Sequence, residues 1–556
     1  MFMAVNLKSV LDSGKYFRVN RNYVAHINST NCVNCGTCRE ICPVGAIEEK
    51  QREICRICPD CTDRPAMTVD QMKEFTTKQA CTTGCPLGIS PQGYIGLVRA
   101  DKPEKALEVI WKKNPLPSVC GRICHHPCEQ VCKRGVLVDE PISIRATKRF
   151  LSDNVELRVE KYPKIYEEKI AVIGAGPAGL TAAHYLLLKG YNVTVFEESD
   201  TPGGMMYRAI PEFRLSRDAM LRDIRRLEDL GMEIRYGVSV DTAMADQLVK
   251  EYDAVVVAVG RKSGRKLSCE GADKGNIVTA LDYLDGINNK NKKKSALENV
   301  VVIGGGDVAM DCARAAKRLG AKNVNAYCME TGDDVPGHPW EIEEAEAEGV
   351  TLHPGFAPVA FPGEGADVTA VTLCKCESSR GADGRIKFEL DKDVTETVDA
   401  NQVILAIGQV ADSIWDAFDG NDKVYFAGDI RNPVCSVVDG MASGKAAAHE
   451  IDTKLQGREL KNPLNLRVLN AAPIEEKIYP ALRLKVERPK MPLQEADARK
   501  TNFDPVEGDY DESVIKTEAW RCLRCGYMEL DVDKCIGCGV CMESCPKGDA
   551  ITMVAI

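Results

Sequence analysis

Short apolar, β-branched runs alternate with longer alanine- and leucine-rich stretches through the middle of the chain. A predicted strand over 169–173 leads through a glycine turn into a helix over 180–189 and a second strand over 192–196. The same order returns with a strand over 300–303, a helix over 310–319 and a strand over 324–328. Alternating strands and helices predict parallel sheets covered by helices. We therefore expect an α/β protein with two Rossmann-like domains.

Both strand–helix turns have the glycine spacing of a dinucleotide site. The first holds Gly174, Gly176, Pro177, Ala178 and Gly179, with Glu197 after the next strand, and the second holds Gly304, Gly306, Asp307 and Ala309. Such glycines let the backbone approach a pyrophosphate at a helix N-terminus, and the acid accepts from a ribose hydroxyl. Two units predict two dinucleotides, one FAD and one NAD(P). The alternative is that one unit has lost its ligand.

Two later apolar segments are expected to complete the flavin half. A strand over 403–408 ends in Gly408, and a strand over 424–428 ends in Gly428 and Asp429. The side chain of Asp429 is placed to accept from the ribityl chain of FAD. A helix over 438–451, opened by Ser436 and Val437, would point its positive end at the flavin and stabilise negative charge on the reduced ring.

Nineteen of the 25 cysteines lie near the two ends of the chain. Two runs have ferredoxin spacing: Cys32-x2-Cys35-x2-Cys38-x3-Cys42-Pro43 and Cys535-x2-Cys538-x2-Cys541-x3-Cys545-Pro546. Three thiolates at this step hold one [4Fe–4S] cubane, and the Cys-Pro turns outward to a second cluster. Zinc is the alternative, but zinc sites seldom need a third cysteine at the same step followed by Cys-Pro.

The cysteine count predicts four or five clusters. The other candidate ligands are Cys55, Cys58, Cys61, Cys81, Cys85, Cys120, Cys124, Cys128, Cys132, Cys522 and Cys525. The piece from Cys32 to Cys61 holds seven thiols, enough for one cluster or two. Alternatively, the two ferredoxin runs meet as halves of one split two-cluster ferredoxin, and spacing alone does not choose between these arrangements.

Composition and charge limit the partners and the cellular compartment that we expect for this protein. The net charge of −10 and the pI of about 5.5 predict no nucleic-acid partner, and no segment has the roughly 20 apolar residues needed to cross a membrane. The N-terminus lacks the apolar core of a signal peptide. So many cysteines indicate metal ligation in a reducing compartment. We expect a cytoplasmic protein, and exposed cubanes favour an anaerobic host.

Four motifs together resemble the small subunit of NADPH-dependent glutamate synthase. They are Gly203-Gly204-Met205-Met-Tyr-Arg208-Ala-Ile-Pro211, the strand ending at Gly260, Gly304-Gly-Gly-Asp307-Val-Ala-Met-Asp311, and Cys120-x3-Cys124-x3-Cys128-x3-Cys132. The same module occurs in dihydropyrimidine dehydrogenase and in NADH-dependent ferredoxin:NADP oxidoreductase. The resemblance implies FAD, a nicotinamide cofactor and two [4Fe–4S] clusters in a helical N-terminal region.

The chain departs from this family at the helical clusters. A family C-x2-C pair is missing before Cys81, and it is replaced either by Cys55-x2-Cys58 or by Cys522-x2-Cys525. The second choice would group Cys522 and Cys525 with Cys81 and Cys132. For the cluster of Cys85, Cys124 and Cys128, a relative's glutamine ligand is matched by Lys148, which cannot ligate as a cation. Cys120 or Glu129 is then the candidate fourth ligand.

A second departure concerns the nicotinamide. Many relatives place arginines after the strand that follows the second glycine turn, whereas this chain has Glu330 there. A carboxylate accepts from a 2′-hydroxyl and repels a 2′-phosphate, so NAD(H) is favoured over NADP(H). The alternative is that Arg314 or Arg318, on the preceding helix, reaches a phosphate. Five glutamates between Glu341 and Glu348 are expected to form a solvated helix face.

The predicted domains follow the motifs. They are a ferredoxin-like segment (1–75), a helical iron–sulfur domain (76–165), an FAD domain (166–285 and 403–455), an NAD(P) domain (286–402), an extended linker (456–519) and a second ferredoxin-like segment (520–556). The proline-rich linker is either a strap that tethers the last segment or a disordered spacer.

The expected activity is electron exchange between NAD(H) and a partner protein or ferredoxin through FAD and the cubanes, with bifurcation permitted by the wiring. No side chain is needed as an acid or base. The absence of a further substrate domain predicts one subunit of a hetero-oligomeric oxidoreductase. The alternatives are a self-contained reductase of a small organic acceptor and a non-catalytic electron-transfer subunit with a vestigial flavin site.

Overall fold

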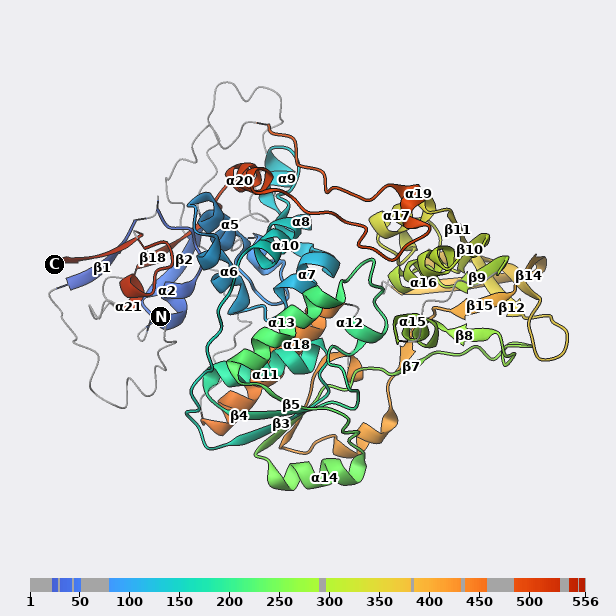
Figure 1. Ribbon diagram of the computed structural model, residues 1–556, viewed down its shortest axis with the longest axis horizontal. Coiled ribbons are helices and arrows are strands. Elements are labelled where there is room, and N and C mark those ends of the chain that lie inside the picture. The colour runs from blue at the N-terminus through green and yellow to red at the C-terminus, as the bar shows by residue number, and fades with distance from the viewer. Residues whose placement is uncertain are drawn as a thin grey trace.

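The first of two parallel sheets is the flavin-half sheet (Figure 1). The computed structural model describes residues 23–28, 31–42, 45–51, 80–289, 297–381, 385–431, 436–457, 485–530, 540–548 and 550–555. The sheet has the order β17-β6-β3-β4-β5, from β3 (Lys169–Ile173), β4 (Asn192–Phe196), β5 (Glu233–Arg235), β6 (Ala254–Val257) and β17 (Val424–Phe426). One face packs against α11 (Pro177–Lys189), α13 (Arg217–Leu230) and α18 (Val437–Leu455), and the other against α14 (Thr242–Glu251).

The second parallel sheet forms the nicotinamide half. Its order is β11-β10-β9-β15-β8, from β8 (Ile277–Thr279), β9 (Asn299–Ile303), β10 (Asn323–Cys328), β11 (Val350–Pro354) and β15 (Gln402–Leu405). α15 (Ala280–Asn289), α16 (Asp307–Arg318) and α17 (Pro339–Ala347) cover one face. An antiparallel sheet of β12 (Phe356–Ala360), β13 (Ala370–Arg380) and β14 (Ile386–Asp399) lies on the other.

Two segments expected in the flavin half belong to this second sheet. β15, inside the strand predicted over 403–408, pairs with β9 and β8, so its assignment to the flavin half is wrong. β8 lies within the predicted 166–285 segment and joins the same sheet. Buried parallel strands are near-continuous apolar runs in either sheet, so their composition carries no information on their neighbours.

The nicotinamide half is inserted into the flavin half. Its two connections pair with each other as β7 (Ser263–Gly264) and β16 (Gln409–Val410), an antiparallel ribbon of two residues each. The remaining short elements are α12 (Met205–Arg208) and three 3₁₀ turns, η1 (Gly332–Asp334), η2 (Ser413–Phe418) and η3 (Gly428–Ile430).

The helical region that holds the central cysteine motifs has seven helices in the described residues. They are α4 (Ala80–Thr83), α5 (Pro91–Arg99), α6 (Pro103–Trp111), α7 (Pro117–Ile123), α8 (Pro127–Gln130), α9 (Lys133–Leu137) and α10 (Ile144–Asn154), of which α4, α7 and α8 contain cysteines. Their apolar side chains share one core with the flavin-half helices, including Leu107, Ile110 and Leu180. Within the described residues, no helix is both long and apolar enough to cross a bilayer.

The two ends of the chain meet beside these helices (Figure 1). β1 (Tyr23–Ile27) pairs antiparallel with β19 (Ile551–Ala555), and β2 (Ile47–Gln51) pairs with β18 (Gly526–Leu530). α2 (Thr37–Ile41) lies against α21 (Val540–Glu543). The ferredoxin-like segments are therefore one unit built from both termini.

Residues 485–511 form a strap between the helical region and the nicotinamide half. The strap runs out to α19 (Ala496–Arg499) beside α17 and returns to α20 (Glu512–Arg521) (Figure 1). A bridge between Leu493 and Glu507 joins its two arms. Of the predicted linker, residues 458–484 lie outside the described residues. The described part of the predicted linker is ordered as this strap and leads into α20. The Asp511 side chain starts that helix by accepting from the Val514 N–H.

Candidate flavin, nicotinamide and iron–sulfur sites

The first glycine turn lies between β3 and α11. Gly174 has a φ of 101°, and a Cβ there would lie 2.6 Å from the Ala258 carbonyl oxygen, so only glycine fits. The buried Glu197 carboxylate accepts from the N–H groups of Ala175 (2.7 Å) and Ser199 (3.0 Å). The turn and the acid therefore meet at the N-terminus of α11, which suits the pyrophosphate and ribose of FAD.

Helix α18 approaches this turn closely. A Cβ on Gly444 would clash with the carbonyl oxygen of Ala178, which lies in the first turn of α11. The Ser436 hydroxyl caps α18 by accepting from the Asp439 N–H, and the Gly428 N–H donates to the Ser443 hydroxyl at 3.0 Å. The segments around Gly428, Asp429, Ser436 and Val437 therefore border the α11 N-terminus, where the sequence places the flavin.

The second glycine turn repeats the first. Gly304 has a φ of 137°, and a Cβ there would clash with the Ala406 carbonyl oxygen. Asp307, the first residue of α16, accepts from the His338 N–H at 2.8 Å and lies 2.6 Å from His338 Nδ1. Glu330 follows β10 and is half-buried. The turn suits the pyrophosphate of a second dinucleotide. Glu330 follows β10, where an acidic residue accepts from the ribose hydroxyl in this fold.

Arg314 and Arg318 are buried and point away from such a ribose. The Arg314 guanidinium donates to Glu348 at 2.8 Å, and Arg318 is bonded to both Glu348 oxygens. The prediction that the 341–348 glutamates form a solvated face is wrong for Glu341 and Glu348, which are buried. Their α16 partners, four residues apart on one helix face, draw them inward, so neither arginine is free for a 2′-phosphate.

One group of neighbouring cysteines combines residues of the helical region with residues of the C-terminal tail. Burial raises the pKa of Cys81 well above its usual value, and the charges of Cys132, Cys525 and Cys522 raise it further. Burial raises the pKa of Cys522 to about 11 and that of Cys525 to about 12; the charge of Cys132 adds to both rises, and that of Cys522 adds to the rise of Cys525. The Arg134 guanidinium bonds the Arg521 carbonyl oxygen, which holds the tail at this place.

A second group of neighbouring cysteines contains Cys85, Cys120, Cys124 and Cys128. Burial raises the pKa of Cys120 to about 12, and Cys124 and Cys85 add to that rise while Lys148 opposes it. Burial alone would lower the pKa of Lys148, but the four thiols raise it above its usual value. The buried ammonium thus lies among the thiols as a counter-charge.

Of the two candidates for the fourth ligand, Glu129 is already engaged. Its two carboxylate oxygens accept from the Arg145 N–H at 2.7 Å and from the Arg488 guanidinium at 2.5 Å. Cys120 is buried, and its sulfur lies 3.6 Å from the Met441 sulfur on α18. Cys120 therefore fits the ligand role better, and it joins the cysteine helix α7 to the flavin helix.

The third group of neighbouring cysteines takes its members from both ferredoxin runs. Burial raises the pKa of Cys38 well above its usual value, and Cys35, Cys32, Cys541 and Cys545 raise it further. Cys35 is likewise influenced by Cys545. Cys42 packs with Cys541 and Cys545 in one small core. Of the two arrangements left open by spacing, the split two-cluster ferredoxin agrees with this geometry. Cys55, Cys58, Cys61, Cys535 and Cys538 lie outside the described residues.

The three groups suit iron–sulfur clusters by their donor chemistry. Within the described ranges, no three His, Cys, Asp or Glu side chains are placed to hold a single metal ion, whereas a cubane holds its four thiolates at separate corners. Thiols that raise one another's pKa repel as thiolates, and a cationic iron–sulfur core relieves that repulsion. Each group therefore fits a cubane.

The other predicted cofactor residues lie around the two turns. Gly203 and Gly204 have positive φ, and a Cβ on Gly204 would lie 3.1 Å from the Gly176 Cα. Met205 opens α12, and Gly260 follows the carboxyl end of β6. Gly408 precedes β16. Arg208 instead pairs with Asp285 of α15 at 3.2 Å, so it links the two halves of the protein.

Sequence reasoning missed two buried groups that position the cysteines. The Asp223 carboxylate of α13 accepts from the Ser118 N–H (2.7 Å), the Val119 N–H (3.1 Å) and the Ser118 hydroxyl (2.8 Å), and thereby caps α7. Arg145 donates to the Arg122 carbonyl oxygen at 2.7 Å, just before Cys124. No motif signals either contact, because the partners are about 20 to 105 residues apart.

We expect Cys35→Ala and Cys545→Ala to remove the same cluster. Each single variant should lose about four irons per chain, and the double variant should lose no more than either, because both thiols belong to one split ferredoxin site. Iron analysis measures this, with Cys376→Ala, a buried thiol of β13, as the control. A double variant that loses about eight irons would instead indicate two independent segments.

Three protein-family models match four segments of the chain. Residues 168–424 match the pyridine nucleotide-disulphide oxidoreductase model, and residues 50–159 match dihydropyrimidine dehydrogenase domain II with a 4Fe-4S cluster. Residues 25–48 and 528–548 each match the 4Fe-4S binding domain. These matches coincide with the two parallel sheets, the cysteine-bearing helices and the joined termini.

Three relatives cover most of the described fold. The NADP(+)-dependent formate dehydrogenase subunit beta of Moorella thermoacetica is 33% identical over an alignment that covers 82% of this chain and 71% of that protein. The NAD-dependent dihydropyrimidine dehydrogenase subunit PreT of Escherichia coli is 33% identical over 68% of this chain and 91% of its own length. The glutamate synthase [NADPH] small chain of Azospirillum brasilense is 30% identical over 67% and 85%.

Proposed function

The chain belongs to the family of pyridine-nucleotide-dependent flavin and iron–sulfur oxidoreductase subunits that includes PreT and the glutamate synthase small chain, and from this we propose that it exchanges electrons between NAD(H) and a partner subunit or ferredoxin. The observation that carries the proposal is the 3.6 Å contact between the Cys120 and Met441 sulfurs. It joins a cluster-binding helix to the helix beside the flavin site. Bound FAD would accept a hydride and release electrons singly.

The residues of the chain bind and orient the redox groups. The two glycine turns would hold the pyrophosphates of FAD and NAD(H), and Glu197 and Glu330 would accept from their riboses. Cys85, Cys120, Cys124 and Cys128 would hold the cluster nearest the flavin. The buried Lys148 would favour the added negative charge of its reduced state.

Electrons would then leave through the outer clusters. Cys81, Cys132, Cys522 and Cys525 would hold the next cluster, and the split ferredoxin would hold two more, which makes four in the grouping proposed. The Gln92 side chain supports this order, because it donates to the Gly526 carbonyl oxygen at 2.6 Å and accepts from the Gly526 N–H at 2.9 Å. The tail carrying Cys525 is thereby joined to α5.

A partner that performs the second half-reaction completes the proposal. Several relatives are named as subunits of larger enzymes, which supports a hetero-oligomer, and the cysteine content favours a reducing cytoplasm. Anaerobic purification followed by iron and flavin analysis and low-temperature EPR of the NADH-reduced protein tests the wiring. We expect one FAD, about 16 irons and reduced-cluster signals. A protein without FAD, or one whose flavin is not bleached by NADH, would contradict the proposal.

NADH should be preferred to NADPH. A 2′-phosphate near Glu330 would be repelled by about 1–2 kcal/mol at a half-exposed site, and Arg314 and Arg318 are engaged elsewhere. We therefore expect kcat/KM to be about 10-fold higher for NADH. The Glu330→Arg variant should move the ratio toward NADPH, with Glu346→Arg on exposed α17 as the control. A wild-type preference for NADPH would refute the assignment.

A further inference from the structure

The covalent link between the two dinucleotide halves is slight. The connecting chain crosses twice, and its two crossings form a ribbon of two residue pairs, Ser263 with Val410 and Gly264 with Gln409. Two short crossings of this kind form a hinge in many two-domain enzymes. Other contacts must therefore set the angle of the nicotinamide half, and the strap of residues 485–511 is a third connection between that half and the cluster-bearing helices.

Glu507 anchors the strap at the helical end. Its carboxylate accepts from the Arg145 guanidinium at 2.5 and 2.8 Å and from Arg149 at 3.1 Å. Burial alone would raise the pKa of Glu507, but Arg145, Arg149 and Arg214 lower it. Arg145 also bonds the carbonyl oxygen of Arg122, next to the loop of Cys124. The anchor therefore reaches the backbone that carries a cluster cysteine.

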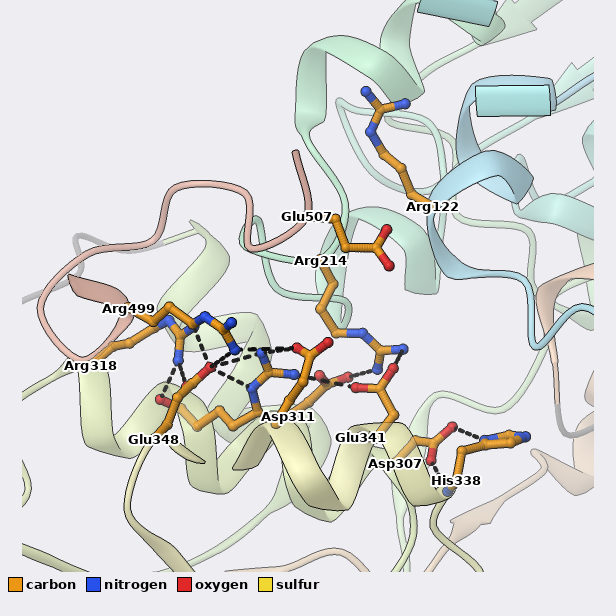
Figure 2. Close-up of polar contacts among 12 residues, drawn as sticks. Arg122, Arg214, Asp307, Asp311, Arg318, His338, Glu341, Glu348, Arg499 and Glu507 are labelled. Atoms are coloured by element: carbon orange, nitrogen blue, oxygen red, sulfur yellow. Dashed lines mark hydrogen bonds and ion pairs between the residues drawn. The ribbon is translucent and has the colours of Figure 1, made fainter. Parts of the chain in front are cut away.

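The adjoining residues of the strap hold the nicotinamide half. The Val506 side chain packs into the core of α16 and β9. The Val506 N–H donates at 2.9 Å to the carbonyl oxygen of Phe213, a flavin-half residue whose ring enters the same core. At the tip, the buried Arg499 lies 4.0 Å from both Glu344 and Glu348. Figure 2 shows Arg499 beside Arg318 and Glu348 at one end of the network around α16 and α17, and Glu507 near Arg214.

The strap closes over a contact between the cluster loop and the nicotinamide half. The ring of His125 stacks on His338 at 5.8 Å, and His126 lies 4.8 Å from Trp340. His338 is the residue that binds Asp307 at the second glycine turn. Glu507 lines the same cavity as these histidines. A change in the angle of the nicotinamide half would separate this contact.

We propose that the strap is a clamp that fixes the nicotinamide half against the cluster-bearing helices, with Glu507 as its central positioning residue. Glu507 contacts the helices through Arg145, its neighbour Val506 packs into the core of α16 and β9, and Arg499 at the tip contacts α17, so the strap spans the hinge. The expected effect on the rate of flavin bleaching rests on the proposed hydride transfer from NADH to FAD. The clamp itself does not depend on that activity, because it is argued from contacts within the chain.

The Glu507→Gln variant tests the clamp in the full-length, cluster-loaded protein. We expect the rate of flavin bleaching at saturating NADH to fall about 10-fold or more, because a small misplacement of the nicotinamide has an effect of this order. The apparent affinity for NADH should change less than two-fold, since the second glycine turn is untouched. Iron and FAD content should match the wild type. Glu495→Gln, an exposed carboxylate on the same strap, is the control.

Amide hydrogen exchange tests the clamp without relying on activity. Exchange of α17 and of residues 304–307 should rise in Glu507→Gln and in Arg499→Gln, which removes the distant end of the clamp, and should stay at the wild-type level in Glu495→Gln. Unchanged bleaching and exchange in both variants would overturn the clamp, as would loss of iron in Arg499→Gln. If NADH does not bleach the wild-type flavin, the proposed function fails, and exchange still decides the clamp.

Discussion

A chain that ends at Arg521 should lose three of the four proposed clusters and keep its flavin. The truncation removes Cys522 and Cys525, which join Cys81 and Cys132, and it removes the C-terminal half of the split ferredoxin. About 12 of 16 irons should be absent. The cluster of Cys85, Cys120, Cys124 and Cys128 should remain, because its thiols lie on helices that share a core with the flavin half. Iron and FAD analysis with EPR measures this.

Two matched variants separate the contributions of the tail. Cys522→Ala with Cys525→Ala should lose about four irons, and Cys541→Ala with Cys545→Ala should lose the split-ferredoxin clusters alone. The truncation retains α20 and its buried pair of Glu518 and Arg521, so the helix end is not exposed. A truncated protein that lacks only about four irons would mean that the N-terminal cysteines hold their clusters unaided.

Glu348→Gln should destabilise the nicotinamide half by about 3–5 kcal/mol, because it leaves the buried Arg318 guanidinium without its carboxylate and removes one of the three carboxylates that pair with Arg314. The side chains of Glu348 and Arg318 have no exposed surface, and that of Arg314 is 1% exposed. Burial alone would raise the pKa of Glu348, but Arg318 and Arg314 lower it below its usual value. The wild-type contribution is therefore present above pH 4.5 and is lost as the pH falls through the lowered pKa.

Thermal unfolding with a probe of each half measures this effect, since a protein of several domains does not unfold in one step. Glu346→Gln, on the exposed side of α17, should change stability by less than about 0.5 kcal/mol. Equal melting temperatures of the two variants would refute a central role for Glu348. The loss should be confined to the nicotinamide half.

The local structure of this protein could largely be predicted from its sequence. Both glycine turns and the helix opened by Ser436 follow from spacing, because backbone conformation is a local constraint. The choice of Cys522 and Cys525 over Cys55 and Cys58 as neighbours of Cys81 comes instead from the resemblance to the family. The place of β15 and the burial of Glu348 could not be predicted. Both depend on partners brought together by the fold, Val300 to Ile303 for the strand and Arg318 for the glutamate.

The antiparallel pairing of β1 with β19 has a consequence for biosynthesis. The cysteines of the first ferredoxin run leave the ribosome more than 500 residues before Cys545, so the proposed shared site cannot close until the second run has also been made. Both dinucleotide halves can fold in that interval, domain by domain. If the split ferredoxin holds its clusters as proposed, iron loading would wait for the second run, and a nascent or prematurely ended chain would expose the thiols of the first run to oxidation.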